Sequence, residues 1–278
     1  MEQVSEIIDA PASTYRLQLH AGFTFVDAAS QLDYLADLGV SHVYCSPILQ
    51  AAPGSMHGYD VVDHSRISAE LGGIDGFRSF AAAAKERGLG VIVDIVPNHM
   101  AVPTPLFHNH VLWDVLRLGS ESEFSAWFDV DVTGSRGVLM PVLGDRIGRE
   151  LASGNITVEE RDIPEADGTL RREHVVVYHD HVFPVRPQTE SLPLAELLDR
   201  QFYRLSYWRV ADEELNYRRF FDVDTLLAVR VEDPAVFDAT HTLLLDLFHA
   251  GHIDAFRIDH PDGLADPRGY MRRLSKAT

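Results

Sequence analysis

The sequence contains little cysteine, few basic residues and no long apolar run. Cys45 is the only cysteine among 278 residues, which excludes an internal disulfide and a multi-cysteine metal site. The 24 Lys and Arg residues face 42 Asp and Glu, and the formal net charge of −18 argues against binding nucleic acids by neutralising phosphates. Residues 1–12 lack the basic start and apolar stretch of a secretory signal. We therefore expect a cytoplasmic protein that binds neither nucleic acids nor membranes.

The composition is that of an ordinary globular protein. Hydrophobic residues make up 46% of the chain and charged residues 24%, so the chain can bury a large core. Cys45 lies in the apolar segment 43–47, where we expect a packed thiol rather than a reactive nucleophile. The sequence has no glycine-rich phosphate loop and no dinucleotide-binding fingerprint, so it predicts no cofactor.

The first hundred residues alternate between strand-like and helix-like segments. The pattern predicts strands at 14–19, 40–46 and 90–96, with helices at 26–38 and 74–87. The segment 90–96 is nearly continuous in β-branched residues, which is typical of a strand covered on both faces of a parallel sheet. Repeated strand–helix units predict right-handed crossovers.

The alternation stops after Met100 and resumes with a strand at 252–258 and a helix that Asp266 and Pro267 begin. An unstructured loop of that length is improbable in a compact domain, so we expect an inserted subdomain. Within it we expect a β-hairpin around 166–168 and a charged helix after Leu192.

The predicted fold is therefore α/β, namely the front portion of a (β/α)8 TIM-type barrel with a large insertion after the third strand. The predicted parts are barrel strands 1–3 in 1–100, the inserted subdomain in 101–240, and strand 4 with its helix in 241–278. Four strand–helix units do not close an eight-stranded barrel, so we expect the remainder of the barrel to be absent from this chain.

Polar side chains stand where the fourth predicted strand ends. Arg257 and Asp259 are two residues apart, so they face the same side of the strand. A guanidinium beside a carboxylate favours the anion, which is the form a carboxylate nucleophile requires. A structural ion pair is the alternative interpretation.

The end of the third strand also carries polar groups. Asp94 interrupts an apolar run, and if it is buried it needs a partner, for which Arg257 on the next strand is the obvious candidate. Asn98 and His99 follow in the loop, where His99 either packs or binds a ligand hydroxyl.

The loop after the second strand carries His57-Gly58-Tyr59-Asp60. Tyr59 either offers a flat apolar face to a sugar ring or packs against the turn.

Together these segments resemble the α-amylase family of retaining glycoside hydrolases, family 13. Residues 58–60 are similar to its sugar-stacking tyrosine motif, 94–99 to its first signature region, and 256–259 to its arginine-plus-nucleophile region. Further segments resemble the glucan-isomerising members of that family, and this resemblance covers essentially the whole chain. Those segments are 14–19, 203–208, 217–222 and 260–264.

The resemblance implies an isomerase acting on maltooligosaccharides. Asp259 would attack the anomeric carbon at the reducing-end α-1,4 linkage, and the released glucose would attack the covalent intermediate to give an α,α-1,1 linkage. Arg257 would keep the nucleophile ionised. The implied substrate-binding residues are His57, Tyr59, Asp94, Asn98, His99, His260 and Asp262, and no metal is implied.

The family's general acid is a glutamate on the next strand, which this chain does not contain, so we expect this chain alone to be inactive. The inserted subdomain would exclude water, with Arg218 and Arg219 as candidates together with the aromatic residues Phe202, Tyr203, Tyr207 and Trp208. Alternatives are an α-amylase-type hydrolase and a non-catalytic glucan-binding fragment. A third alternative is a metal protein, in which His108 and His110, or His179 and His181, share one face of a strand.

Overall fold

The computed structural model describes residues 10–130, 132, 136–165 and 168–278. The chain divides into two compact units, each described by itself. Unit 1 contains Met1–Pro97 and Phe237–Thr278, and unit 2 contains Asn98–Val236. Within the described ranges, no helix combines the length and the apolar character needed to cross a bilayer.

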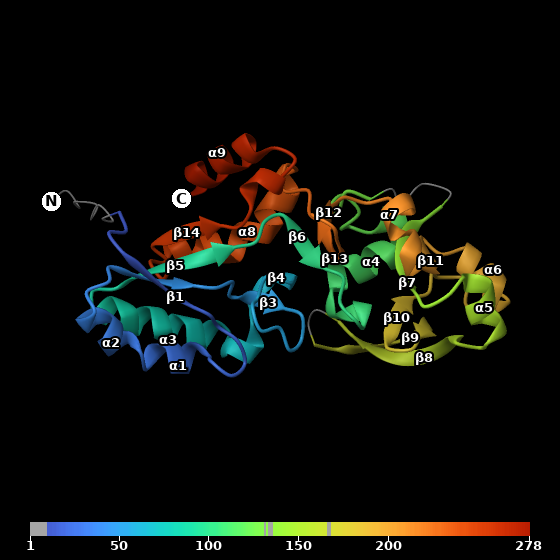
Figure 1. Ribbon diagram of the computed structural model, residues 1–278, viewed down its shortest axis with the longest axis horizontal. Coiled ribbons are helices and arrows are strands. Elements are labelled where there is room, and N and C mark those ends of the chain that lie inside the picture. The colour runs from blue at the N-terminus through green and yellow to red at the C-terminus, as the bar shows by residue number, and fades with distance from the viewer. Residues whose placement is uncertain (1–9, 131, 133–135, 166–167) are drawn as a thin grey trace. The chain divides into compact units, whose positions relative to one another are not determined.

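A parallel sheet of four strands forms the centre of unit 1, in the order β1-β2-β5-β14 (Figure 1). The strands are β1 (Thr14–Leu17), β2 (His42–Cys45), β5 (Gly90–Ile95) and β14 (Ala255–Ile258). A short antiparallel pair, β3 (Leu49–Ala51) with β4 (Val61–Ile67), lies in the connection from β2 to β5. The predicted α/β class is confirmed, and the fourth strand is shorter than the predicted 252–258.

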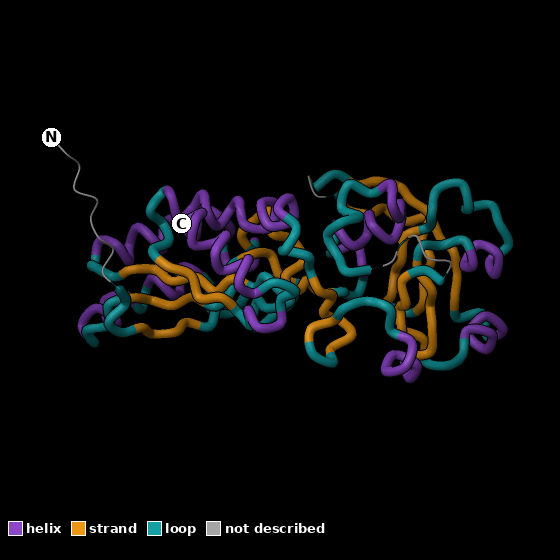
Figure 2. The backbone as a smooth tube through the Cα atoms, turned by 90° about the horizontal axis from the view of Figure 1, so that it is seen from above, coloured by secondary structure: helices purple, strands orange, loops and turns teal. Residues whose placement is uncertain are grey.

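Helices pack around this sheet, as the tube in Figure 2 shows. They are α1 (Phe25–Ala29), α2 (Leu32–Asp37), α3 (Gly73–Glu86), α8 (Pro234–His249) and α9 (Pro267–Ala277). Phe77 and Phe80 of α3 are buried, as are Val43 and Cys45 of β2. Because side chains alternate along a strand, Tyr44 lies on the opposite face of the sheet from Val43 and Cys45.

The helices of unit 1 confirm one local prediction and correct another. Asp266 caps α9 as predicted, because its side chain accepts a hydrogen bond from the Gly269 backbone N–H at 2.9 Å. The helix predicted over 26–38 is instead two short helices, α1 and α2. At the break the Ser30 hydroxyl donates to the Asp27 carbonyl at 2.6 Å, so a side chain competes with the regular backbone ladder.

The described residues of unit 2 form three small sheets. One has the order β12-β13-β6, one pairs β7 with β11 in parallel, and one has the antiparallel order β10-β9-β8. The strands are β6 (His99–Ala101), β7 (Val138–Leu143), β8 (Ile156–Pro164), β9 (Leu170–Tyr178), β10 (His181–Pro184), β11 (Tyr203–Tyr207), β12 (Arg219–Phe220) and β13 (Val223–Ala228). The helices are α4 (His110–Leu118), α5 (Ile147–Ala152), α6 (Leu194–Asp199) and α7 (Ala211–Glu214).

The predicted hairpin corresponds to β8 and β9, which pair in antiparallel register from Ile156↔Tyr178 to Pro164↔Leu170. Residues 166 and 167 of its expected turn lie outside the described residues. The predicted helix after Leu192 corresponds to α6.

Candidate active site

Asp94 and Arg257 are direct neighbours in the sheet of unit 1. Parallel pairing of β5 with β14 places Arg257 in register with Asp94, and Arg257 Nη1 donates to Asp94 Oδ1 at 3.0 Å and to Oδ2 at 3.3 Å. The Asp94 side chain is fully buried, while the Arg257 side chain is 42% exposed. The predicted ion pair is therefore confirmed, and it gives the buried carboxylate the partner that it needs.

Two tyrosines from other segments complete the surroundings of Asp94. The Tyr44 hydroxyl donates to Asp94 Oδ2 at 2.5 Å, and the Tyr59 hydroxyl donates to the same oxygen at 2.7 Å. Burial first, and then the hydrogen bond to Asp94, raise the pKa of both tyrosines, so both hydroxyls keep their protons and remain donors. The carboxylate is thus held by donors from β2, from the loop after β3, and from β14.

Arg257 joins this buried group to Asp259. Its Nη1 also lies 2.5 Å from Asp259 Oδ1, and Asp259 is itself buried with 6% exposure. Burial opposes the charge of Arg257, but the hydrogen bonds to Asp94 and Asp259 outweigh it and raise the pKa of Arg257. The permanently charged guanidinium of Arg257 and the Asp259 side chain thus form a close, charge-assisted contact at the end of β14.

The loop that carries Tyr59 is held in a tight conformation. Gly58 adopts φ +80°, and a Cβ there would lie 2.7 Å from the Pro47 carbonyl oxygen, so only glycine fits. The His57 Nδ1 accepts a hydrogen bond from the Tyr59 backbone N–H at 3.0 Å, and the two rings stack with centroids 6.1 Å apart. His57 thereby supports the position of Tyr59.

His260 and Asp262 follow the proposed nucleophile. His260 has a left-handed backbone (φ 39°), and its Nε2 lies 4.0 Å from Asp259 Oδ1. Asp262 lies farther out, with a side chain that is 80% exposed and 3.9 Å from His260 Nδ1. His260 therefore adjoins Asp259, whereas Asp262 lies at the exposed edge of this segment.

Asn98 and His99 belong to unit 2. The Asn98 carbonyl accepts a hydrogen bond from the Val229 backbone N–H at 2.8 Å. His99 begins β6, is 1% exposed, and its ring centroid lies 4.4 Å from that of Phe220. The structure brings together Tyr59, Asp94, Arg257 and Asp259 within unit 1, and the grouping of Asn98 and His99 with them stays a prediction.

The family model described as "Alpha amylase, catalytic domain" matches residues 27–270, which is most of the chain. The chain belongs to the α-amylase family. The family assignment agrees with the resemblance of the three signature segments, including the segment of Arg257 and Asp259.

Within the α-amylase family, the chain is similar to several proteins named maltooligosyl trehalose synthase. A solved structure of that enzyme from Arthrobacter ramosus is 46% identical, with a TM-score of 0.85 over 96% of this chain and 33% of its own. A Mycobacterium tuberculosis protein named for the same synthase is 44% identical over 94% of this chain and 32% of its own length. The intracellular maltogenic amylase of Bacillus subtilis is 34% identical over 36% of this chain. The chain thus spans about a third of the synthases that it matches.

The sequence did not predict two residues that contact this group of side chains, namely Arg16 and Tyr44. Arg16 on β1 is in register with Tyr44 on β2; its guanidinium lies 5.5 Å from the Tyr44 ring, and its Nη2 donates to the Tyr59 hydroxyl at 3.3 Å. Both residues lie on strands of the parallel sheet, as the polar strand ends do. Their contacts with Asp94 and Tyr59 depend on how the strands pair, which the sequence does not show. Arg16 thereby extends the network onto β1, a fifth segment of unit 1.

The candidate residues in unit 2 differ in burial and in contacts. Tyr203 is a packing residue, because it is 2% exposed and its hydroxyl donates to the Pro184 carbonyl at 2.9 Å. Phe202 lies under the Arg186 guanidinium at 4.4 Å, and Trp208 is 55% exposed. Arg218 and Arg219 form ion pairs with Asp129 and Asp224, respectively.

The histidine pairs do not share a strand face, so the arrangement that the metal-protein alternative required is wrong. His108 ends a 3-10 turn and His110 begins α4, while His179 lies in a turn and His181 begins β10. The alternation of a strand therefore does not apply to either pair. In the part of the chain that the structure describes, no group of three or more His, Cys, Asp or Glu side chains is arranged to hold a metal ion.

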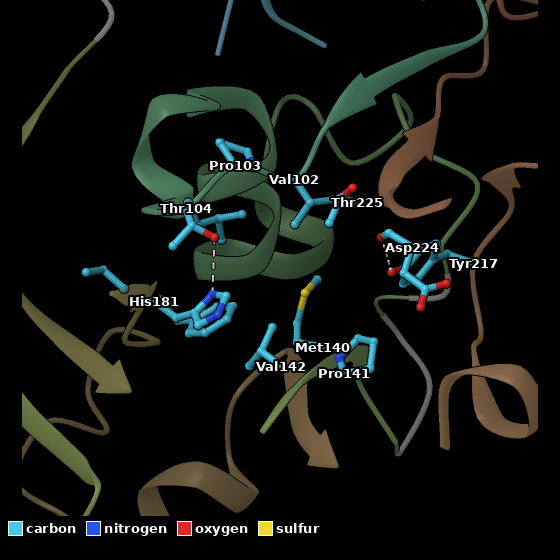
Figure 3. Close-up of a pocket in the computed structure, with 13 residues that line it drawn as sticks. Val102, Pro103, Thr104, Met140, Pro141, Val142, His181, Tyr217, Asp224 and Thr225 are labelled. Atoms are coloured by element: carbon cyan, nitrogen blue, oxygen red, sulfur yellow. Dashed lines mark hydrogen bonds between the residues drawn. The ribbon is translucent and has the colours of Figure 1, made fainter. Parts of the chain in front are cut away.

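A pocket that is open to solvent lies in unit 2 (Figure 3). Its walls are mostly apolar and include Val102, Met140 and Val142. At one edge the Thr104 hydroxyl and His181 Nδ1 are 3.3 Å apart. Since apolar walls offer few partners for hydroxyl groups, this pocket suits an aliphatic group better than a sugar.

Proposed function

We propose that this chain carries the nucleophile of an enzyme that isomerises the reducing end of maltooligosaccharides, from an α-1,4 to an α,α-1,1 linkage. The observation that carries the proposal is the contact of Arg257 Nη1 with Asp259 Oδ1, where a parallel strand ends. Identities of 44–47% to maltooligosyl trehalose synthases over at least 94% of the chain support this reaction rather than another of the family.

In the proposed reaction, Asp259 attacks the anomeric carbon of the glucosyl unit bonded to the reducing-end glucose. The bond from that carbon to O4 breaks, and O4 receives a proton from a general acid. The freed glucose turns, and its anomeric hydroxyl oxygen attacks the glycosyl ester carbon, while the hydroxyl proton passes to the conjugate base of the acid. Asp259 leaves as the carboxylate, and two inversions retain the α configuration.

The residues of the chain have separate proposed roles. Arg257 stabilises the anionic form of Asp259, and Asp94 holds Arg257 through its buried carboxylate. Tyr59 and His57, with Asn98, His99, His260 and Asp262, bind the sugar. The resemblance implies a glutamate on the next strand as general acid, and we assign that role to no residue of this chain.

We further propose that the four-stranded sheet is part of a (β/α)8 barrel, and that residues 101–240 form a subdomain inserted after its third strand. Parallel neighbours in chain order support the barrel. The insertion would exclude water, which is necessary because water competes with glucose for the glycosyl ester. The single, buried cysteine supports the proposed cytoplasmic location.

The test follows the number of reducing ends during incubation with maltohexaose. It uses this chain and an extended protein, in which the chain is followed by the segment of the Arthrobacter ramosus relative that it does not cover. Isomerisation lowers the number of reducing ends, hydrolysis raises it, and binding alone leaves it unchanged. We expect a fall with the extended protein.

Paired variants identify the nucleophile. Asp259→Asn in the extended protein should reduce turnover by about 10³-fold or more, because a neutral amide cannot form the glycosyl ester. Asp37→Asn, which alters an exposed aspartate of α2, is the matched control and should leave turnover unchanged. A rise in reducing ends would favour hydrolysis, and full activity of Asp259→Asn would contradict the assignment.

A further inference from the structure

A two-residue turn in unit 2 carries an unusual residue. Strands β12 and β13 pair so that Phe220 is opposite Val223, and Phe221 and Asp222 form the turn between them. Phe221 has φ 52°, in the left-handed region that two-residue hairpin turns usually fill with glycine, asparagine or aspartate. For a bulky side chain this backbone conformation is strained.

The side chain of Phe221 carries a second cost. It is 67% exposed, so most of an apolar ring faces water. Glycine at this position would relieve the backbone and remove the exposed ring together. Strain of this kind points to a function of the side chain rather than to the stability of the fold.

The ring of Phe221 continues a row of aromatic rings within unit 2. Its centroid lies 4.4 Å from the Phe220 ring, and the Phe220 ring lies 4.4 Å from that of His99. The sheet fixes this row, because β13 pairs with β12 on one side and with β6, where Ala228 is opposite His99, on the other. The row leads from a buried histidine with a proposed sugar-binding role to an exposed phenylalanine.

Neighbouring charges keep the turn in place. Arg219, one residue before Phe220, is hydrogen-bonded to Asp224 of β13. The hydrogen bond to Asp224 outweighs partial burial and raises the pKa of Arg219, so the guanidinium in this cross-strand contact stays charged. The exposed ring is therefore presented on a braced hairpin.

We infer that Phe221 is a glucan-contacting residue whose ring packs against the C–H face of a glucose unit. This inference rests on the proposed function, which supplies an α-1,4-glucan as the ligand. A pyranose ring has an apolar face of axial C–H groups, and an exposed aromatic ring is a surface on which such a face packs without needing a hydrogen bond. Removal of water from both surfaces offsets the cost of exposing the ring in the free protein.

A second turn in the same unit provides a matched control. His179 and Asp180 join β9 to β10, His179 has φ 51°, and its ring lies 4.4 Å from the preceding Tyr178 ring. His179→Gly therefore makes the same backbone change in a turn of the same length that also continues with aspartate. Any general effect of a new glycine on the unfolded chain is common to the two variants.

The experiment measures binding and stability in the extended protein with Asp259→Asn as background, so that maltohexaose binds without turnover. We expect Phe221→Gly to weaken maltohexaose binding about fivefold in calorimetry. Its thermal unfolding midpoint should be equal to or above that of His179→Gly, because the Phe221 ring serves the ligand and not the fold. His179→Gly should bind maltohexaose as the background protein does.

Further variants make the result decisive. Phe221→Tyr keeps the ring and should retain binding, whereas Phe221→Asn, which tolerates the left-handed backbone, should bind as weakly as Phe221→Gly. Unchanged binding of Phe221→Gly, or a midpoint well below that of His179→Gly, would overturn the inference. Binding that depends on Phe221 in a protein that raises the number of reducing ends would overturn the isomerase proposal alone.

Discussion

Arg257 and Asp94 are register partners on adjacent parallel strands, and one nitrogen of the guanidinium serves two carboxylates. Arg257 Nη1 lies 3.0 Å from Asp94 Oδ1 and 2.5 Å from Asp259 Oδ1. Of the two carboxylates that Arg257 contacts, Asp94 is fully buried and holds the guanidinium in place. Asp259 is the carboxylate to which we assign the chemistry. Loss of Asp94 should therefore affect the fold, and loss of Asp259 should affect the reaction.

The first prediction concerns Asp94→Asn. The amide offers a donor where Arg257 and two tyrosines also donate, so these donors lose the buried carboxylate that accepts from them, and Arg257 keeps only Asp259 as a carboxylate partner. We expect a loss of about 3 kcal/mol in the free energy of unfolding, at the lower end for broken buried ion pairs because Arg257 is partly exposed. Urea unfolding measures it. Asp33→Asn, at an exposed ion pair with Arg87, is the control and should change far less; an equal loss would contradict the burial argument.

The second prediction concerns Tyr44→Phe, which removes one hydrogen-bond donor to Asp94 and keeps the aromatic ring. Arg257 then orients Asp259 less firmly, so kcat of the extended protein should fall about tenfold with little change in KM. Tyr270→Phe is the matched control, since its hydroxyl bonds His241 in the same unit, outside this network. Similar kcat values for the two variants would exclude a positioning role for Tyr44.

Part of this site follows from the sequence alone. Asp94 interrupts a β-branched strand and Arg257 lies on the next one along the parallel sheet, so burial of a charge was enough to predict their contact. Arg16 and Tyr44 could not be predicted, because the register between β1 and β2 depends on long-range packing rather than on either segment. The conformation of Phe221 could not be predicted either, because two-residue hairpin turns favour glycine or asparagine at such a position.

The third prediction concerns Cys45. Its thiol is fully buried in β2, and burial raises the pKa of the thiol to about 12, so almost none of it is thiolate at neutral pH. The native chain should not react with iodoacetamide at pH 8 over an hour, and it should react fully in urea, as mass spectrometry can measure. Rapid labelling of the folded chain would show that Cys45 is accessible and would revive the reactive-thiol interpretation.

The fourth prediction concerns the pH dependence of stability through His241 of α8. Its Nδ1 bonds the Phe237 carbonyl at 2.9 Å, and its Nε2 accepts from the Tyr270 hydroxyl at 2.9 Å, which is the pattern of a neutral ring. Burial is the main cause that lowers the pKa of His241 from 6.5 to about 4, against the bond to Phe237, and Arg273 also disfavours the charge.

Because the lowered value belongs to the folded state, the unfolded chain binds a proton at His241 first as the pH falls. The contribution of His241 is present above pH 6.5 and is lost between pH 6.5 and 4, by about 3 kcal/mol in the free energy of unfolding over that range. Urea unfolding at pH 7.5, 6 and 5 should show this loss in the parent chain. His241→Gln, compared at the same three values, should lose less, because the other titrating groups are common to both proteins and cancel in the difference. If the free energy of unfolding falls equally with pH in the two proteins, His241 takes up its proton without unfolding. Water that reached the ring between Phe237 and Tyr270 would have this effect.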